Sequence, residues 1–135
     1  MDTPFKTLGI AGTGMAAQRE RLNVIAQNIA HAQDTNRGDG TPWRRKLVAF
    51  EAVLSGETEG GVRLAGVRED DKTEMPKVRL PGHPDADKDG WVVMPNVNPV
   101  FEMVELLSAS RAYEANLQVA RSFRTMVEQA LTLGR

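Results

Sequence analysis

The 135-residue sequence contains no cysteine, few aromatic residues (5%) and almost no net charge, with 17 Lys and Arg against 18 Asp and Glu. The absence of cysteine excludes disulfide scaffolds, thiol nucleophiles and cysteine-ligated zinc or iron–sulfur sites. The charge balance argues against nucleic-acid binding, which normally needs a basic surface, and against a basic segment that binds anionic lipids. We therefore expect neither nucleic acid nor lipid as a direct partner.

Long apolar runs are also missing. No stretch approaches the roughly 18 consecutive apolar residues of a membrane-spanning helix. The first residues, Met1-Asp2-Thr3-Pro4, have neither the basic start nor the apolar stretch of a secretory signal peptide. We expect a chain that carries no cleaved signal peptide and does not use the general secretory route.

Both ends of the sequence have the apolar spacing of long helices. Residues 1–32 place apolar side chains at alternating steps of three and four, with Gln18 as the polar member. This stripe comprises Leu8, Ala11, Met15, Leu22, Ile25 and Ile29. After Asn98, a predicted helix cap, residues 99–135 carry two adjacent stripes. The first includes Leu106, Tyr113, Leu117 and Val127, and the second includes Ala109, Val119, Phe123 and Met126. The pattern predicts long N- and C-terminal helices that form a coiled coil.

Between the helices, short extended segments alternate with glycine-marked turns, which predicts four strands. The strands lie near residues 43–53, 62–67, 78–80 and 91–94. The predicted fold class is mainly α with a small β region. The predicted division is an N-terminal helix (1–35), a small β-rich or extended middle segment (36–97) and a C-terminal helix (98–135).

The two-faced C-terminal helix needs more covering surface than the chain offers. Helices paired with each other cover one face each, and a middle segment of about 60 residues is near the lower limit for independent folding. An exposed apolar stripe of this length is typical of an interface, which favours a subunit that oligomerises or forms filaments. The alternative is a helical hairpin buried against a small sheet within one monomer.

One segment has the spacing of a metal-binding loop. Asp85, Asp87 and Asp89, followed by Gly90, match the first half of an EF-hand calcium loop. Asn96 stands at the position of the bidentate Glu, and the flanking sequence is extended rather than helical. A solvated hairpin turn explains the same residues, since Asp and Gly suit tight turns. A small calcium-binding module that uses these three aspartates is the alternative function.

No catalytic arrangement is recognisable in the sequence. His31 and His83 have no partner at metal-ligand spacing, and there is no Gly-x-Ser-x-Gly motif. Gly9, Gly12 and Gly14 resemble a nucleotide-binding loop, but no strand precedes them. As small residues they permit close packing of helices. We expect a protein that is not an enzyme and binds no cofactor.

Two short charged runs lie in the middle segment. Arg44-Arg45-Lys46 is predicted to lie at a strand edge or to form ion pairs between subunits, because no acidic segment is an obvious mate. Glu69-Asp70-Asp71 is predicted to be a solvated acidic turn.

Several motifs resemble those of the bacterial flagellar basal-body rod proteins, and within them the proximal rod group. The motifs are Gly12–Gln18, Leu22–Ala30, Pro42–Lys46, Phe50-Glu51, Met94–Asn98, Glu102-Met103, Ser108–Asn116 and Thr132–Gly134. Together they span essentially the whole chain. His31 stands where the family usually has Asn, a residue that adopts left-handed backbone angles more readily than His does.

The resemblance implies a structural role. Such proteins pack their terminal helices as a coiled coil, with the middle segment outside, and stack helically on themselves and on other rod and basal-body proteins. They leave the cytoplasm through the flagellar type III export apparatus and transmit motor torque across the periplasm. The implied assembly and packing residues are Leu22, Ile25, Asn28, Ile29, Asn96, Leu106, Tyr113, Asn116, Leu117 and Val127. The three asparagines are implied to hold backbone turns or interhelical hydrogen bonds.

Overall fold

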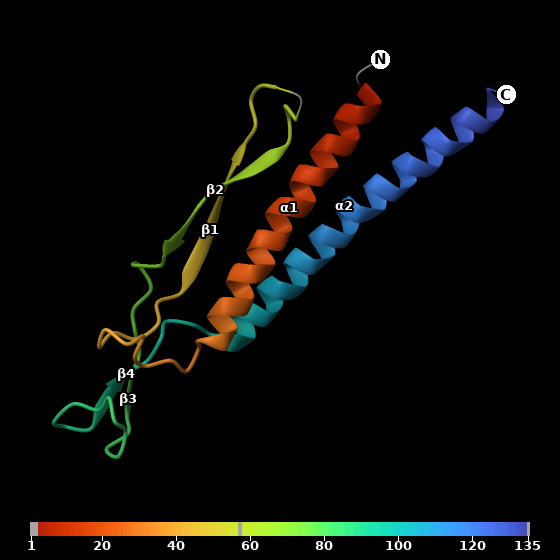
Figure 1. Ribbon diagram of the computed structural model, residues 1–135. Helices are drawn as coiled ribbons and strands as arrows, with labels where there is room; N and C mark the ends of the chain where they lie inside the picture. The colour runs from red at the N-terminus through yellow and green to blue at the C-terminus, as the bar shows by residue number, and fades with distance from the viewer. Residues whose placement is uncertain (1–2, 57, 135) are drawn as a thin grey trace. The chain divides into compact units, whose positions relative to one another are not determined.

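The computed structural model describes residues 3–56 and 58–134. Two long helices, α1 (Thr3–Ala30) and α2 (Pro99–Leu133), come first and last in the chain. Between them, β1 (Lys46–Ala52) pairs with β2 (Val62–Glu69), and β3 (Lys77–Arg79) pairs antiparallel with β4 (Trp91–Val93) (Figure 1). The structure confirms the predicted fold class, with two terminal helices and a small β region.

The start of α2 follows from local sequence. Asn98 Oδ1 accepts hydrogen bonds from the backbone N–H groups of Val100 (3.1 Å) and Phe101 (3.3 Å), which have no partner inside the helix. Pro99 suits the first helical position because its ring fixes φ and its missing N–H costs nothing there. Glu102 lies in the first turn, where the helix dipole favours a negative charge. The predicted cap is therefore confirmed.

The chain divides into two compact units, and each long helix contributes to both. Unit 1 comprises Met1–Leu22, Val48–Gly66 and Leu107–Arg135, and unit 2 comprises Asn23–Leu47 and Val67–Leu106. The division of the sequence into residues 1–35, 36–97 and 98–135 stays a prediction. Neither long helix, over the residues that the structure describes, has the apolar length needed to cross a membrane.

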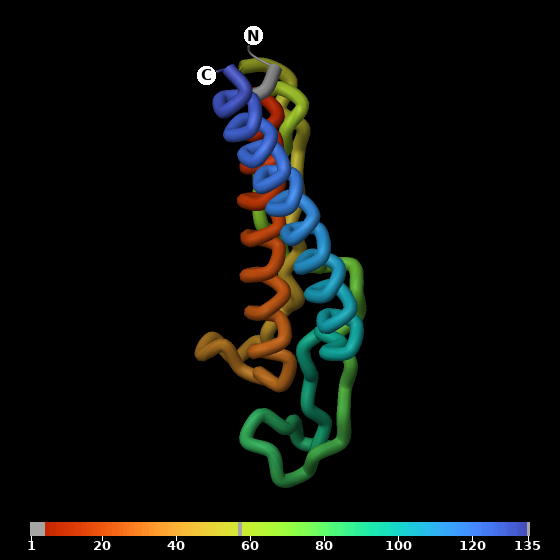
Figure 2. Tube along the Cα trace, turned by 90° about the vertical axis from the view of Figure 1, so that its right-hand side faces the viewer, coloured from red at the N-terminus to blue at the C-terminus, as the bar shows by residue number. Residues whose placement is uncertain are grey.

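In unit 1, α1 lies between the β1–β2 hairpin and α2 (Figures 1 and 2). On the hairpin side, the backbone N–H of Val62 donates to Thr13 Oγ1 (3.2 Å). On the α2 side, Gly14 lies against Asn116, and a Cβ at position 14 would lie 2.9 Å from both Asn116 Nδ2 and Oδ1. The two helices approach this closely because Gly14 has no side chain.

Alanine substitutions at Gly12 and Gly14 are expected to change the stability of the chain in opposite directions. Nothing lies within 4 Å of a Cβ at Gly12, so Gly12→Ala should stabilise the helix by about 0.5–1 kcal/mol. Gly14→Ala should displace the Asn116 side chain and break its hydrogen bond to the Ala112 carbonyl. We expect Gly14→Ala to be less stable than Gly12→Ala by about 1–3 kcal/mol in urea unfolding. Equal gains at both positions would show that the helices are not in close contact at Gly14.

The buried apolar core is small in both units. In the described chain its side chains are Ala11, Ala17 and Ala109 in unit 1, and Val24, Ile25, Ala32 and Val92 in unit 2. The largest fully buried side chains are Glu102, Val92 and Asn28, all in unit 2. Two of these three are polar, so unit 2 depends on polar contacts to an unusual degree.

Candidate functional site

Unit 2 contains a group of hydrogen-bonded polar and charged residues that we call the buried polar cluster. Its members are Asn28, Arg45, Asp70, Asn96 and Glu102. Glu102 is 0% exposed and Asn28 is 1% exposed. Buried polar groups at this depth must find partners inside the protein, because an unpaired one costs the free energy of its lost hydration.

Asn28, near the end of α1, has partners on three segments. Its Oδ1 accepts hydrogen bonds from the Lys46 backbone N–H (2.8 Å) and from Trp43 Nε1 (3.4 Å). Its Nδ2 donates to the Lys46 carbonyl (2.9 Å) and to Glu102 Oε2 (3.2 Å). The side chain thus pairs with the first residue of β1 as a neighbouring strand would, and it also links α1 to α2.

Arg45 occupies the centre of the buried polar cluster. Its guanidinium donates through Nε to Glu102 Oε1, lies 3.8 Å from Asp70 Oδ2, and stands 5.2 Å from the centre of the Phe101 ring. Its backbone N–H donates to Asn96 Oδ1 (2.6 Å). One residue therefore contacts the start of α2, the turn after β2 and the segment before α2.

Asn96 and Asp70 complete the cluster. Asn96 Nδ2 donates to the carbonyls of Asp70 (3.0 Å) and Thr73 (3.1 Å). The Asp70 carboxylate accepts from the Thr73 hydroxyl (2.7 Å) and from the backbone N–H groups of Thr73 and Lys72. These hydrogen bonds, the Thr73 hydroxyl first, and the Arg45 charge hold the pKa of the Asp70 carboxyl below its usual range.

Asp70→Asn should reduce stability at neutral pH but not at acidic pH. Because the pKa of Asp70 is lower in the folded chain than in the unfolded one, its charge stabilises the fold above the unfolded pKa of about 3.9. This contribution is lost as the pH falls through the folded pKa. We expect Asp70→Asn to lower the free energy of unfolding by about 1–3 kcal/mol at pH 7, with the difference shrinking below about pH 4. Asp71→Asn, at the exposed neighbour, is the control and should change stability by under about 0.5 kcal/mol. A constant deficit at all pH values would contradict the assignment.

Two sequence expectations are corrected by this cluster. The Arg44-Arg45-Lys46 run is predicted to lie at a strand edge or to form ion pairs between subunits; Lys46 does begin β1, but Arg45 forms its ion pair within the chain, with Glu102, 57 residues away. Asp70 was expected in a solvated turn, yet it is 6% exposed, whereas its neighbours Glu69 and Asp71 are exposed. Glu102 is distant in sequence from Arg45, and Arg45 and Asn96, which contact Asp70, are distant from Asp70. Local charge patterns carry no information about such contacts.

His31 follows the end of α1 without left-handed backbone geometry, since no described residue other than glycine has a positive φ. Its ring stacks on Trp43 with the ring centres 4.0 Å apart, and its Nδ1 lies 3.0 Å from Asp34 Oδ2. The imidazole therefore extends the buried polar cluster outward through Trp43, and the turn does not require Asn.

The ten predicted assembly and packing residues are all at least partly buried within the chain itself. Ile25, Asn28 and Asn96 are buried. Leu22, Ile29, Leu106, Tyr113, Asn116, Leu117 and Val127 are partly buried. Asn116 donates to the Ala112 carbonyl of its own helix (2.9 Å). Their part in assembly stays a prediction.

The fold leaves apolar residues exposed on α2, as the two-stripe pattern predicts, but two residues near the start of the helix, Val100 and Val104, lie outside both predicted stripes. Val100, Met103 and Val104 are 70%, 55% and 61% exposed, and we call these three the α2 ridge. Their spacing puts them on one face of α2, on the opposite side of the helix from the buried Glu102. Unit 1 has further exposed apolar side chains on α2, namely Leu107, Val119, Met126, Leu131 and Leu133. The burial of Glu102 explains why Val100 and Val104 are exposed, because this carboxylate lies on the inner face of the helix.

The candidate calcium loop is occupied by the chain's own donors. Asp85 accepts from the Thr35 hydroxyl (2.7 Å) and from Asn36 Nδ2 (3.3 Å), and these bonds lower the pKa of its carboxyl. Asp87 Oδ1 accepts from the backbone N–H groups of Asp89 and Trp91 (both 2.9 Å). Among the described residues, no group of three or more His, Cys, Asp or Glu side chains is arranged to hold a metal ion.

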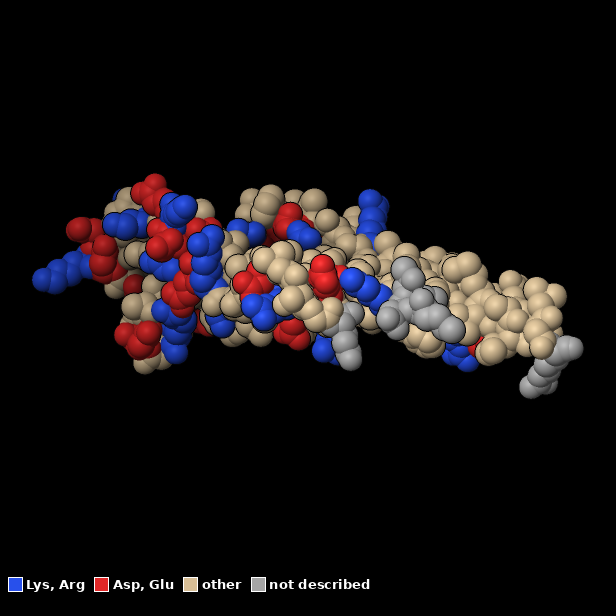
Figure 3. All heavy atoms as spheres, turned by 90° about the horizontal axis from the view of Figure 1, so that it is seen from above, with Lys and Arg blue, Asp and Glu red and all other residues tan. Residues whose placement is uncertain are grey.

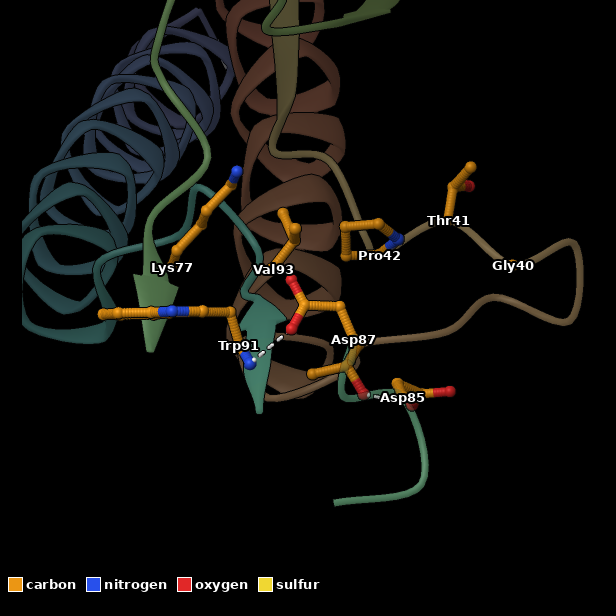
Figure 4. A pocket seen from close by; sticks show the side chains of 9 residues that line it. Gly40, Thr41, Pro42, Lys77, Asp85, Asp87, Trp91 and Val93 are labelled. Carbon is orange, nitrogen blue, oxygen red and sulfur yellow. Dashed lines mark hydrogen bonds between the residues drawn. The ribbon is translucent and has the colours of Figure 1, made fainter. Parts of the chain in front are cut away.

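The same loop borders an open cavity of about 220 Å³ in unit 2. Lys77, Trp91 and Val93 line it from the β3–β4 ribbon, and Asp85 and Asp87 line it from the loop. The Trp91 indole points away from both carboxylates (Figure 4). The cavity therefore does not combine an aromatic surface with the two charges.

Comparison with known proteins gives a consistent result. The family model described as "Flagellar basal body rod FlgEFG protein C-terminal" matches residues 88–133. The flagellar basal-body rod protein FlgC of Salmonella typhimurium is 46% identical over 93% of this chain and 94% of its own length. FlgC of Borreliella burgdorferi is 39% identical over 96% of each chain, and FlgC of Bacillus subtilis is 34% identical over 98% of this chain and 99% of its own. The matches extend over both helices and the middle segment, so the chain belongs to the bacterial flagellar basal-body rod protein family, the family that contains FlgC.

Proposed function

We propose that this chain is a structural, non-enzymatic subunit of the proximal rod of the flagellar basal body. It assembles helically, through its terminal helices, with copies of itself and with other rod and basal-body proteins. The rod crosses the periplasm and transmits motor torque. The chain reaches it through the flagellar type III export apparatus without a cleaved signal peptide. The similarity to FlgC proteins over nearly the full chain supports the family part of this proposal.

The proposed assembly is supported mainly by the exposure of apolar side chains on α2. The α2 ridge leaves three large apolar side chains more than half exposed on consecutive turns of one helix. In unit 1, Leu131 and Leu133 are 68% and 89% exposed, and the end of α2 shows few charged side chains in Figure 3. Exposed apolar surface of this kind is typical of a protein interface. Neighbouring subunits in a rod would cover it.

The partly buried residues have a different part in this proposal. Leu22 and Ile25 on α1, and Leu106, Tyr113 and Leu117 on α2, are packed inside the chain. They hold the helices together so that the exposed faces are presented outward. Close-packed helices resist deformation because their interiors have low compressibility, and a shaft that transmits torque needs this stiffness.

The proposal is tested by replacing the FlgC gene of a flagellated bacterium with the coding sequence of this chain. We expect restored motility and the chain in purified basal bodies. A version without residues 1–30, which lacks most of the buried apolar side chains, should be absent from basal bodies. Full motility with the chain absent from basal bodies, or rods that contain the truncated version, would contradict the proposal. Saturable micromolar calcium binding by the full chain would instead favour the calcium-binding alternative, which no observation on the described residues supports.

A further inference from the structure

We propose that the Arg45–Glu102 ion pair is a register lock, which selects one pairing of the end of α1 with the start of α2 and adds little to stability. This inference concerns the isolated chain and does not depend on its place in the rod. The role assigned to the buried polar cluster is to select the register of the two helices, which apolar packing alone does not determine.

The apolar stripes cannot set the register of the helices by themselves. The stripe on α1 repeats at steps of three and four, and so does the stripe on α2 that contains Leu106, Tyr113 and Leu117. A shift of one helix by a single turn therefore places apolar side chains against apolar side chains again. The buried apolar side chains are also few, since Val24 and Ile25 are the only buried ones on the described part of α1 within unit 2. Two buried side chains make too few contacts to distinguish between registers that differ by one turn.

The buried polar cluster distinguishes registers because both oxygens of Glu102 are in use. Oε2 accepts from Asn28 Nδ2 (3.2 Å), and Oε1 accepts from Arg45 Nε. A shift of α2 by one turn would keep this carboxylate on the same face of the helix but move it about 5.4 Å along the axis. The carboxylate and the guanidinium would then be left without each other in a buried site, which is strongly unfavourable.

Arg45 is itself fixed from several sides, so it provides a stable reference for the helix. Its backbone N–H donates to Asn96, its carbonyl accepts from the Asp70 N–H (2.7 Å), and its guanidinium lies near the Asp70 carboxylate. Only α2 among these partners is a long helix with a repeating apolar face. The ion pair thus constrains α2, the element whose repeating apolar face would otherwise allow a shift along its axis.

The same physics argues against the ion pair as a source of stability. Burial removes the water around both charges, and their mutual attraction does little more than offset that loss. Well-packed apolar replacements of similar volume are often neutral or stabilising, whereas removal of one partner leaves a buried unpaired charge. A single buried polar residue that fixes the register of paired helices is the best-attested use of such groups.

The test separates register from stability by comparing single and double variants. Urea unfolding gives the midpoint, and NMR of the isoleucine δ1 methyl groups reports packing, because Ile10, Ile25 and Ile29 are the isoleucines of the chain. Ile25 lies one turn before Asn28 on α1 and is 5% exposed. We expect Arg45→Met and Glu102→Leu each to lower the midpoint. The double variant should regain the wild-type midpoint or exceed it, but the Ile25 and Ile29 signals should split or broaden.

Glu102→Gln keeps the shape and the acceptor oxygen without the charge, so it should lower the midpoint yet retain one sharp signal for each isoleucine. Ile10, in unit 1, is the internal reference. A double variant with the wild-type midpoint and three sharp methyl signals would overturn the register role. A double variant at or below the midpoints of the single variants, or one that fails to fold, would show that the pair acts through stability.

Discussion

Replacement of Glu102 by alanine is expected to lower the free energy of unfolding by about 3–5 kcal/mol, because the Arg45 guanidinium loses its hydrogen-bonded buried partner and keeps only the longer contact to Asp70 (3.8 Å). Asn28 loses one of its two acceptors at the same time. This is a large share of the roughly 5–15 kcal/mol by which domains of this size are stable. Urea unfolding followed by circular dichroism measures the effect.

The matched control is Glu114→Ala on the exposed side of the same helix. Glu114 is exposed, so this change should alter stability by under about 0.5 kcal/mol. Helix propensity changes equally in the two variants, and their difference therefore isolates the buried carboxylate. A Glu102→Ala protein within 1 kcal/mol of the control would show that Arg45 finds water or another partner, and the buried polar cluster would lose its importance.

Replacement of Val104 by aspartate is expected to prevent incorporation into the rod while the chain still folds. Val104 is 61% exposed in the single chain, so a carboxylate there stays hydrated and costs little. If a neighbouring subunit covers the α2 ridge, the same carboxylate loses its water without gaining a partner. A penalty of about 3 kcal/mol lowers the association constant roughly hundredfold. Motility of a strain that produces this variant, and its content in purified basal bodies, measure the effect.

Gln118→Asp provides the comparison for Val104→Asp, since Gln118 is also exposed on α2 but lies outside the α2 ridge. Both variants add one negative charge to the same helix. We expect motility to fall with Val104→Asp and to persist with Gln118→Asp, with unchanged unfolding midpoints in both. Normal rods built from the Val104→Asp chain would mean that the α2 ridge faces solvent in the assembled rod.

The sequence predicts the elements of this fold well because their signals are local. The spacing of Leu22, Ile25 and Ile29 indicates a helix directly. Asn98 and Pro99 mark the start of α2, which begins at Pro99. The four strands appear where β-branched and apolar residues cluster between turn glycines. Such features depend on neighbours in the chain, which a single sequence displays.

The candidate site depends on contacts that are distant in sequence, and there the predictions fail in part. The charges of Arg45 and Asp70 look solvated in the sequence, yet Glu102 pairs with Arg45, and Asn96 and Arg45 contact Asp70, all within unit 2. In the same way, the apolar pattern of α2 does not reveal which stripe the chain buries. The buried carboxylate of Glu102 settles that orientation, and it leaves Val100 and Val104 in solvent.

Electron cryo-microscopy of basal bodies that contain this chain tests the central claim most directly. We expect a neighbouring subunit to cover Val100, Met103 and Val104 in the rod, with the Arg45–Glu102 pair intact inside each copy. A rod in which these three side chains face solvent, with subunits joined only through the middle segments, would contradict it.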